Sequence, residues 1–236
     1  MRHGALTDAF TFVGEWAKNP LQVAAVLPSG PQLAELITSE IDTRSGHVLE
    51  LGPGTGVFTQ CLLDRGVCES QITLIEQTDT FANILSSRFP DANLVRRDAA
   101  SIAPMRLSEE GPAGAAVSGI GLRSLPQSAV ERIVAAAFAQ LKRDGSFYQF
   151  TYGLTCPVSR NILRRLDLVA ECIGIAWRNL PPARVYRLRR RDPELDTTAV
   201  FLAAARGAPP IASLDTAPAG VAAPAWTREG ELQSQI

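Results

Sequence analysis

The sequence predicts an α/β fold with a mostly parallel sheet, N-terminal helices and an antiparallel hairpin at the end of the sheet. Short apolar runs alternate with helical periodicity after residue 46, which is typical of strand–helix–strand units. A turn containing Gly52, Gly54 and Gly56 separates the first apolar run from an amphipathic stretch. Acidic residues, Glu76 and Asp98, stand at the ends of the next two runs. A parallel sheet gathers such positions at one edge, where doubly wound folds bind ligands.

The N-terminal residues 1–42 predict two amphipathic helices. Leu6, Phe10, Val13 and Ala17 share one helical stripe, and Ser29 is a candidate N-cap for a second helix over residues 30–41. The apolar face either packs on the rest of the chain or lies on a membrane surface. The sequence leaves both interpretations open.

The elements of the sheet follow in order. Strands are expected at 47–51, 71–76, 92–96, 114–118 and 145–152, with helices at 56–66, 78–89, 126–142 and about 158–174. Two further strands, 183–190 and 197–204, are joined by the turn at residues 191–194 and bring the expected number of strands to seven. We therefore expect one domain over residues 43–206. Residues 207–236, rich in Ala, Pro and Gly, are expected to form a disordered tail.

Composition excludes several classes of function. The net charge of −1 provides no global attraction to nucleic acid or to an anionic membrane. The four cysteines have no metal-ligand spacing and the chain has only two histidines, so no metal site is expected. No stretch approaches the ~20 apolar residues that span a bilayer, and the start of the chain does not read as a signal peptide. These features predict a cytoplasmic protein without a transmembrane segment.

The residues around the glycine turn indicate the ligand. Glycines allow positive φ and close approach of a ligand to the backbone, and the helix N-terminus that follows favours an anionic group. Glu50 stands just before the turn, where its carboxylate would repel a pyrophosphate and attract an ammonium group. A ligand with a carboxylate and an ammonium group satisfies both demands. The methionine half of S-adenosylmethionine carries the two together, so we expect this cofactor, held in part by Glu50, Gly52, Gly54 and Gly56.

Three strand ends complete the expected cofactor site. Glu76, followed by Gln77, stands about 20 residues after the glycine turn, where doubly wound nucleotide sites place an acid for the ribose hydroxyls. Asp98, followed by Ala99, can accept a hydrogen bond from the adenine amino group, although pairing with Arg96 or Arg97 would make it structural. Ser118 ends the fourth strand, next to the expected position of the transferable methyl group.

Several stretches together resemble the bacterial phospholipid N-methyltransferases, within the Rossmann-like class I methyltransferases. They are Trp16-Ala-Lys-Asn-Pro-Leu, Ala25-Val-Leu-Pro-Ser29, Leu49-Glu-Leu-Gly-Pro-Gly-Thr-Gly-Val-Phe-Thr59, Gln149-Phe-Thr-Tyr-Gly153 and Asn179-Leu-Pro-Pro-Ala-Arg-Val-Tyr186. The resemblance covers roughly residues 10–205. After the fourth strand this chain has Gly119-Ile-Gly-Leu122 where that family tends to have Gly-Leu-Pro-Leu, and the difference affects the expected acceptor pocket.

The resemblance implies an enzyme that methylates the amine of phosphatidylethanolamine and its mono- and dimethyl forms, as a peripheral protein at the inner face of the cell membrane. Tyr152 is the expected catalytic residue, since it ends the fifth strand, and aromatic rings also hold methylated ammonium groups. Further contacts to the acceptor are expected from Ser29, Arg184 and Tyr186.

A dense run of arginines, from Arg184 to Arg191, either grips lipid phosphate or is a solvated outer strand. Three other functions remain open at this point: methylation of a small soluble amine, methylation of adenine in ribosomal RNA, and cofactor binding without catalysis. Specific binding of nucleic acid is not expected, because the chain after Ser118 lacks the proline and the aromatic residue of an adenine clamp.

Overall fold

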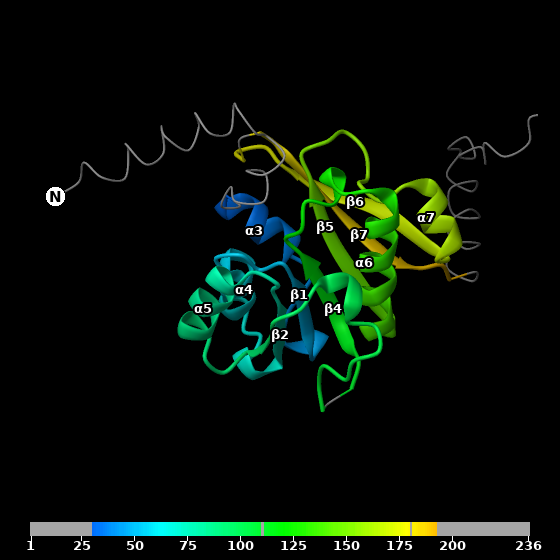
Figure 1. The fold of residues 1–236 in the computed structure, drawn as a ribbon. Coiled ribbons are helices and arrows are strands. Elements are labelled where there is room, and N and C mark those ends of the chain that lie inside the picture. Colours follow the sequence, from blue (N-terminus) through cyan, green and yellow to red (C-terminus); the bar gives the residue numbers. More distant parts are fainter. Residues whose placement is uncertain (1–29, 110, 180, 193–236) are drawn as a thin grey trace, which may run out of the picture. The chain divides into compact units, whose positions relative to one another are not determined.

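Among the residues that the structure describes, seven strands form one sheet in the order β3-β2-β1-β4-β5-β7-β6. The computed structural model describes residues 30–109, 111–179 and 181–192. Within them, β1 to β5 form parallel pairs and β7 is antiparallel to both of its neighbours, β5 and β6. Figure 1 shows this arrangement, with helices on both sides of the sheet. The predicted fold class, a mostly parallel sheet that ends in an antiparallel hairpin, is confirmed.

The strands are Val48–Leu51 (β1), Ile72–Ile75 (β2), Asn93–Val95 (β3), Ala113–Ser118 (β4), Leu141–Thr151 (β5), Leu168–Ala176 (β6) and Ala183–Arg190 (β7). The helices are Pro31–Ile37 (α3), Val57–Asp64 (α4), Asp79–Arg88 (α5), Gln127–Gln140 (α6) and Arg160–Arg165 (α7). Two 3-10 turns matter for the site, Ala99–Ser101 (η3) and Leu122–Ser124 (η4). The first five expected strands and the helices between them are all present, with ends that differ by a few residues.

One predicted helix is wrong. The stretch 158–174 was expected to be a single helix, but α7 ends at Arg165 and β6 begins at Leu168. Asp167 between them has a positive φ of 52°, which breaks the helical path. Backbone pairing with β7 from Leu168 to Ala176 then outweighs the local helical preference of this segment.

The two strands that form the antiparallel hairpin also differ from those expected. Its first predicted strand, 183–190, is β7, but the partner of β7 is β6, which precedes it in the chain. The second predicted strand, 197–204, lies outside the described residues, as do Ser29, the N-terminal helical stripe and the C-terminal tail.

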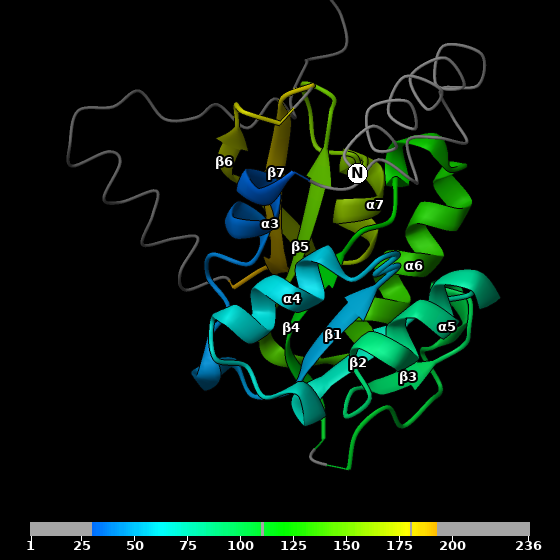
Figure 2. The same ribbon diagram turned by 90° about the vertical axis from the view of Figure 1, so that its left-hand side faces the viewer.

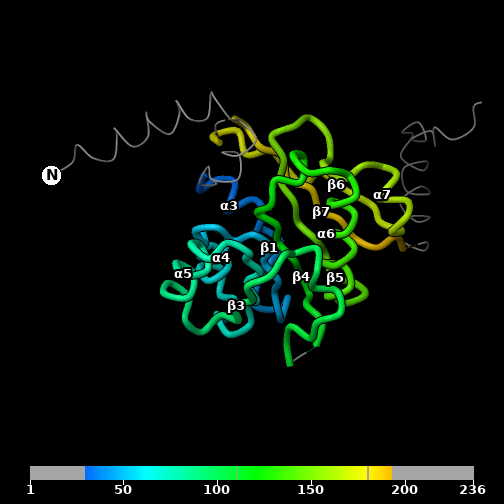
Figure 3. Tube along the Cα trace, in the orientation of Figure 1, coloured from blue at the N-terminus to red at the C-terminus, as the bar shows by residue number. Residues whose placement is uncertain are grey.

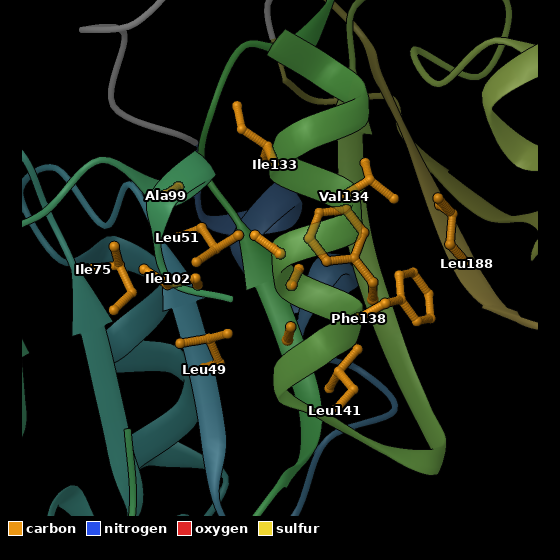
Figure 4. Packing of buried hydrophobic residues seen from close by; sticks show 14 of the residues in the cluster. Leu49, Leu51, Ile75, Ala99, Ile102, Ile133, Val134, Phe138, Leu141 and Leu188 are labelled. Atoms are coloured by element: carbon orange, nitrogen blue, oxygen red, sulfur yellow. The ribbon is translucent and has the colours of Figure 1, made fainter. Parts of the chain in front are cut away.

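Two layers of helices cover the sheet. Figure 2 shows α3, α4 and α5 on one face, and Figure 1 shows α6 and α7 on the other. On the α6 side, the buried cluster contains Leu49 and Leu51 of β1, Phe147 of β5, Val134 of α6 and Leu188 of β7, part of which is drawn in Figure 4. The run of buried residues in β1 and β2 follows from this covering on both faces.

The crossover connections between the strands determine which loops lie next to one another. β1 and β4 are hydrogen-bonded neighbours, although more than 60 residues separate them in the sequence, and the trace in Figure 3 shows them side by side. Their carboxyl ends, together with those of β2 and β5, lie at one edge of the sheet. This edge, called here the carboxyl edge, carries the residues described next.

Candidate active site

The glycine turn after β1 leaves an exposed stretch of backbone for a ligand. Gly52, Gly54 and Gly56 have φ values of +63°, +57° and +82°, a region that other residues rarely adopt. A Cβ placed on Gly54 would have no other atom within 4 Å, whereas one on Gly52 would lie 2.8 Å from Cγ1 of Ile120. Gly56 packs against Phe89 and begins α4. Of the three glycines, Gly54 is therefore the one that faces open space.

Glu76 links the glycine turn to the end of β2. Its Oε1 accepts a hydrogen bond from the Thr78 N–H at 2.8 Å, and its Oε2 accepts a longer one from the Gly54 N–H at 3.3 Å. A carboxylate has about four acceptor positions, so two hydrogen bonds leave capacity for hydroxyl donors. The side chain is buried and immobilised beside the glycine turn, at the position expected for a ribose-binding acid.

A cavity of about 260 Å³ opens next to Glu76. It brings together five of the predicted cofactor residues, which are Gly52, Glu76, Gln77, Asp98 and Ala99. Asp98 also accepts a hydrogen bond from the Ala100 N–H at 2.9 Å and so caps η3, which gives this carboxylate a structural role beside any ligand contact. The volume suits part of a nucleoside, since sites for whole small molecules usually enclose roughly 300–1,000 Å³.

Other residues of the cavity were not predicted. Ile120 forms part of its wall after β4, and Ala129, Arg132 and Ile133 line it from α6. Spacings of three and four residues place these α6 side chains on one helical face. The sequence shows that face, but only the crossover from β4 to β5 puts it over the carboxyl edge.

Glu50 does not line this cavity. The side chain is fully buried on the α4 side, where its Oε2 accepts a hydrogen bond from the Thr59 hydroxyl at 2.7 Å. Its Oε1 has no hydrogen-bond partner among the described residues. Burial raises the pKa of the Glu50 carboxyl to about 7, and the Thr59 hydrogen bond opposes this shift. The expected attraction between Glu50 and an ammonium group stays a prediction, and the structure adds that the carboxyl is buried against Thr59 of α4.

Ser118 and Gln149 shape the loop after β4. Ser118 is fully buried, and its hydroxyl accepts a hydrogen bond from the Ile120 N–H at 3.3 Å. Gln149, in register with Ser118 on β5, donates from Nε2 to the Ile120 carbonyl at 2.9 Å. These two side chains hold Ile120 against the glycine turn. Gln149 was noticed in the sequence only as part of a motif, without a role.

Tyr152 follows β5 at the same edge, and its ring is fixed by neighbours. It packs edge-on against Phe150, with ring centroids 5.5 Å apart. Burial raises the pKa of the Tyr152 hydroxyl above its ordinary value, and a hydrogen bond with Asn179 opposes the shift. The phenol is therefore neutral at physiological pH and acts as a hydrogen-bonding group, not as an anionic base.

Asn179 is a buried residue whose role the sequence did not reveal. Its Oδ1 accepts a hydrogen bond from the Gly30 N–H at 2.9 Å, and its Nδ2 donates to the Pro181 carbonyl at 3.0 Å. The residue thus ties the beginning of α3 to the loop between β6 and β7, next to Tyr152. The only sequence signal was its place in the Asn179–Tyr186 motif.

The two predicted acceptor residues on β7 lie at different depths. Arg184 pairs in register with Thr151 at the end of β5, and its Nη1 donates to the Gly153 carbonyl at 3.4 Å. Tyr186 pairs with Gln149 and packs against the hydrophobic cluster under α6 and α7. The structure therefore brings Arg184, but not Tyr186, to the carboxyl edge, where it contacts Gly153.

Two of the remaining arginines of β7, Arg187 and Arg190, have structural partners. Arg187 forms ion pairs with Glu40 at 3.1 Å and Glu171 at 2.6 Å. Arg190 donates to the Lys142 carbonyl at 2.6 Å and lies over the ring of Phe138. The arginine run is therefore not one continuous basic surface, and only Arg184 is at the carboxyl edge.

Comparisons with known proteins agree with this architecture. No family model matches the sequence. The chain is 29% identical over 191 residues to an ornithine lipid N-methyltransferase from Singulisphaera acidiphila. The matched stretch covers 78% of this chain and 97% of that protein. A shorter stretch of 66 residues is 38% identical to ribosomal RNA small subunit methyltransferase A from Prosthecochloris aestuarii, covering 28% of this chain and 24% of that protein.

A solved structure shares the fold at low sequence identity. The 1,6-didemethyltoxoflavin-N1-methyltransferase of Burkholderia thailandensis, crystallised with S-adenosylhomocysteine, superposes with a TM-score of 0.55 at 14% identity, over 81% of this chain and 92% of that one. Its likeness establishes the fold, and the sequence relative extends the likeness along most of the chain. The strand order, the glycine turn and these likenesses together show that the chain has the Rossmann-like fold of the class I methyltransferases.

Proposed function

We propose that the protein transfers methyl groups to the amine of a membrane phospholipid, namely phosphatidylethanolamine and its mono- and dimethyl forms. The observation that carries the proposal is the extent of the sequence likeness to the ornithine lipid enzyme. It spans 97% of that relative, so it is not confined to the glycine turn. Both kinds of lipid present an amine and an acidic group at the membrane surface.

The residues at the carboxyl edge fit S-adenosylmethionine. The backbone at Gly54 faces open space, and Glu76 has free acceptor positions beside a cavity whose volume suits part of a nucleoside. When bound, the cofactor supplies a methyl group on a sulfonium, which an amine displaces in line. The predicted contacts from Gly52, Gln77, Asp98 and Ala99 are part of this proposal because they line the cavity.

The protein's task is mainly to align the amine and exclude water. Holding two reactants in a productive geometry lowers the barrier by up to about 7–11 kcal/mol. Tyr152 can contact the amine through its hydroxyl or its ring, and Phe150 and Asn179 fix its orientation. Because the phenol stays neutral, the amine proton leaves to water before transfer.

A direct test is incubation with the cofactor labelled on its methyl group and a panel of acceptors in mixed micelles. The panel contains phosphatidylethanolamine, its methylated forms, ornithine lipid, free ethanolamine and ribosomal RNA, with products separated by chromatography. Label in phosphatidylethanolamine and its methylated forms is the expected result. Label only in ethanolamine or RNA would contradict the proposal, and cofactor binding without transfer to any acceptor would indicate a non-catalytic protein.

We further propose that the protein acts as a peripheral protein at the inner face of the cell membrane. No helix among the described residues is long and apolar enough to cross a membrane. Co-sedimentation with anionic liposomes tests this part separately. A protein that methylates dispersed lipid but stays in the supernatant would retain the proposed reaction and lose the proposed location.

A further inference from the structure

Two arginines from separate elements meet at Gly153, directly after Tyr152. Arg123 belongs to η4 in the loop after β4, and Arg184 lies near the beginning of β7. A Cβ placed on Gly153 would lie 2.5 Å from Nη1 and 2.7 Å from Cζ of Arg123, so this guanidinium packs directly on the glycine. Arg184 Nη1 reaches the carbonyl of the same residue at 3.4 Å. Two positive groups therefore converge at Gly153, the residue that follows Tyr152 in the chain.

Neither arginine has an acidic partner among the described residues. Arg184 has its long hydrogen bond to Gly153, and Arg123 forms no ion pair there. This contrasts with Arg187, which two glutamates neutralise on the other face of β7. Two guanidinium groups placed together without an anion repel each other, and an acidic ligand group between them would remove that repulsion.

The chemistry of the proposed acceptor supplies such a group. Guanidinium groups recognise carboxylate and phosphate oxygens through paired hydrogen bonds. We infer that Arg123 and Arg184 bind the acidic group of a zwitterionic lipid headgroup and thereby place its amine at Tyr152. The inference rests on the proposed function and deepens it, since it names the feature that distinguishes the acceptor from a plain amine.

This arrangement also gives a role to the loop that departs from the resembled family. Gly119-Ile-Gly-Leu122 leads directly into Arg123, and Gln149 and Ser118 fix the start of the loop through Ile120. The loop therefore presents a cation to the acceptor side, while its first residues pack on the glycine turn.

The test compares two acceptors in micelles of one neutral detergent. One is zwitterionic, either phosphatidylethanolamine or ornithine lipid, and the other is a long-chain alkylamine without an acidic group. Arg123→Gln and Arg184→Gln should each raise the KM for the zwitterionic lipid by about tenfold or more, because a charge-assisted hydrogen bond is lost, with little change in kcat. The preference for the zwitterionic lipid over the alkylamine should fall by the same factor. Arg123→Lys should show an intermediate loss, since it keeps the charge and loses the planar fork.

Controls separate this role from folding and from general attraction to the membrane. Arg143→Gln removes an exposed arginine at the opposite edge of the sheet and should leave both KM values unchanged. Affinity for S-adenosylhomocysteine and the thermal unfolding midpoint should be the same in all variants. A double Arg123→Gln, Arg184→Gln variant that keeps the full preference for the zwitterionic lipid would overturn the inference. The proposed function would still stand in that case, provided that the enzyme methylates the lipid.

A direct measurement of lipid binding distinguishes failure of the inference about the arginine pair from failure of the proposed function. Dihexanoyl phosphatidylethanolamine is titrated below its micelle concentration into protein saturated with S-adenosylhomocysteine. Binding by the wild-type protein and loss of binding in the double variant would support the arginine pair even if no methyl group is transferred. Equal binding by both proteins would refute the pair whatever the enzyme methylates.

Discussion

At the scale of single residues, two glutamates near the glycine turn have opposite environments. Glu76 accepts hydrogen bonds from two backbone N–H groups, which suit a charged carboxylate. Glu50 has one hydroxyl partner and a second oxygen without one, and it is fully buried. Glu76 is therefore positioned as a hydrogen-bond acceptor, whereas burial raises the pKa of Glu50 to about 7.

Replacing Glu50 by Gln tests this difference through pH. The folded-state pKa of about 7 lies above the ordinary value of 4.5, so the folded protein holds a proton that the unfolded chain releases. The free energy of unfolding of the wild type should consequently fall as pH rises from about 4.5 to about 7, by roughly 3 kcal/mol, and then level off. Glu50→Gln lacks this contribution. Without cofactor, its unfolding free energy relative to wild type should rise between pH 5 and pH 8 in denaturant titrations.

A stability difference that does not change with pH would contradict the raised pKa of Glu50. If Glu50→Gln shows the same stability difference at both pH values but loses affinity for S-adenosylmethionine, the carboxylate is charged and faces the ammonium group of the cofactor, as the sequence suggested.

Glu76→Ala should weaken S-adenosylmethionine binding at least about tenfold, because the proposed acceptor for the ribose is removed and Gly54 loses a hydrogen bond. Calorimetric titration measures the effect, and Asp144→Ala, an exposed acid at the other edge of the sheet, serves as the control. An unchanged dissociation constant in a folded Glu76→Ala protein would remove this residue from the site.

Substitution of Tyr152 tests which group accepts the proton of the lipid amine. Since its raised pKa keeps the phenol neutral, the rate should increase with pH as the lipid amine loses its proton, in wild type and Tyr152→Phe alike. Tyr152→Phe should lower kcat by about tenfold at most, whereas Tyr152→Ala, which removes the ring, should be worse. A pH profile that changes shape in Tyr152→Phe would show that the hydroxyl itself takes the proton.

At the scale of elements, the turns after β1 and β4 are packed backbone to backbone. A Cβ placed on Gly119 would lie 2.3 Å from the carbonyl oxygen of Gly52, which is too close for any real contact. The Gly52 N–H in turn donates to the Ile75 carbonyl at 2.9 Å. The glycine turn is therefore positioned by two neighbouring strands and not by its own sequence alone.

Gly119→Ala should push these two turns apart. We expect lower stability by about 1–3 kcal/mol, as for other overpacked sites, together with a loss of cofactor affinity. Gly121→Ala is the matched control two residues away, because its added Cβ would meet no atom within 4 Å and its φ of −72° suits alanine. Thermal unfolding and cofactor titration of the two variants give the comparison. Equal behaviour of both would show that the turns can separate at no cost.

At the scale of the whole molecule, one prediction concerns residues 1–17, which lie outside the described residues. Deleting residues 1–17, whose apolar stripe includes Phe10 and Val13, should abolish turnover of lipid in vesicles. The stripe is expected either to contact the membrane or to form a wall of the acceptor pocket. Activity on vesicles and on dispersed short-chain lipid separates the two, since a lost membrane contact spares the dispersed substrate. Full activity of the truncated enzyme on vesicles would refute both.

The sequence by itself predicted the parallel part of the sheet, through its alternation of apolar runs and amphipathic stretches. Apolar runs such as Val48–Leu51 and Ile72–Ile75 have no other stable place than a sheet covered on both faces. The glycine turn and the acids Glu76 and Asp98 could be located for the same reason, because local chemistry marks a strand end.

The tertiary structure alone decided the segments whose partners are distant in the chain. Residues 168–176 became a strand because β7 offered a free edge, against their helical pattern. Glu50 lies on the face of β1 covered by α4, a choice made by helix packing. Arg123 and Arg184, about 60 residues apart, meet at Gly153 because β5 lies between the loop after β4 and strand β7. Local sequence patterns indicate which face of its own strand or helix a residue occupies, but not which other element packs against that face.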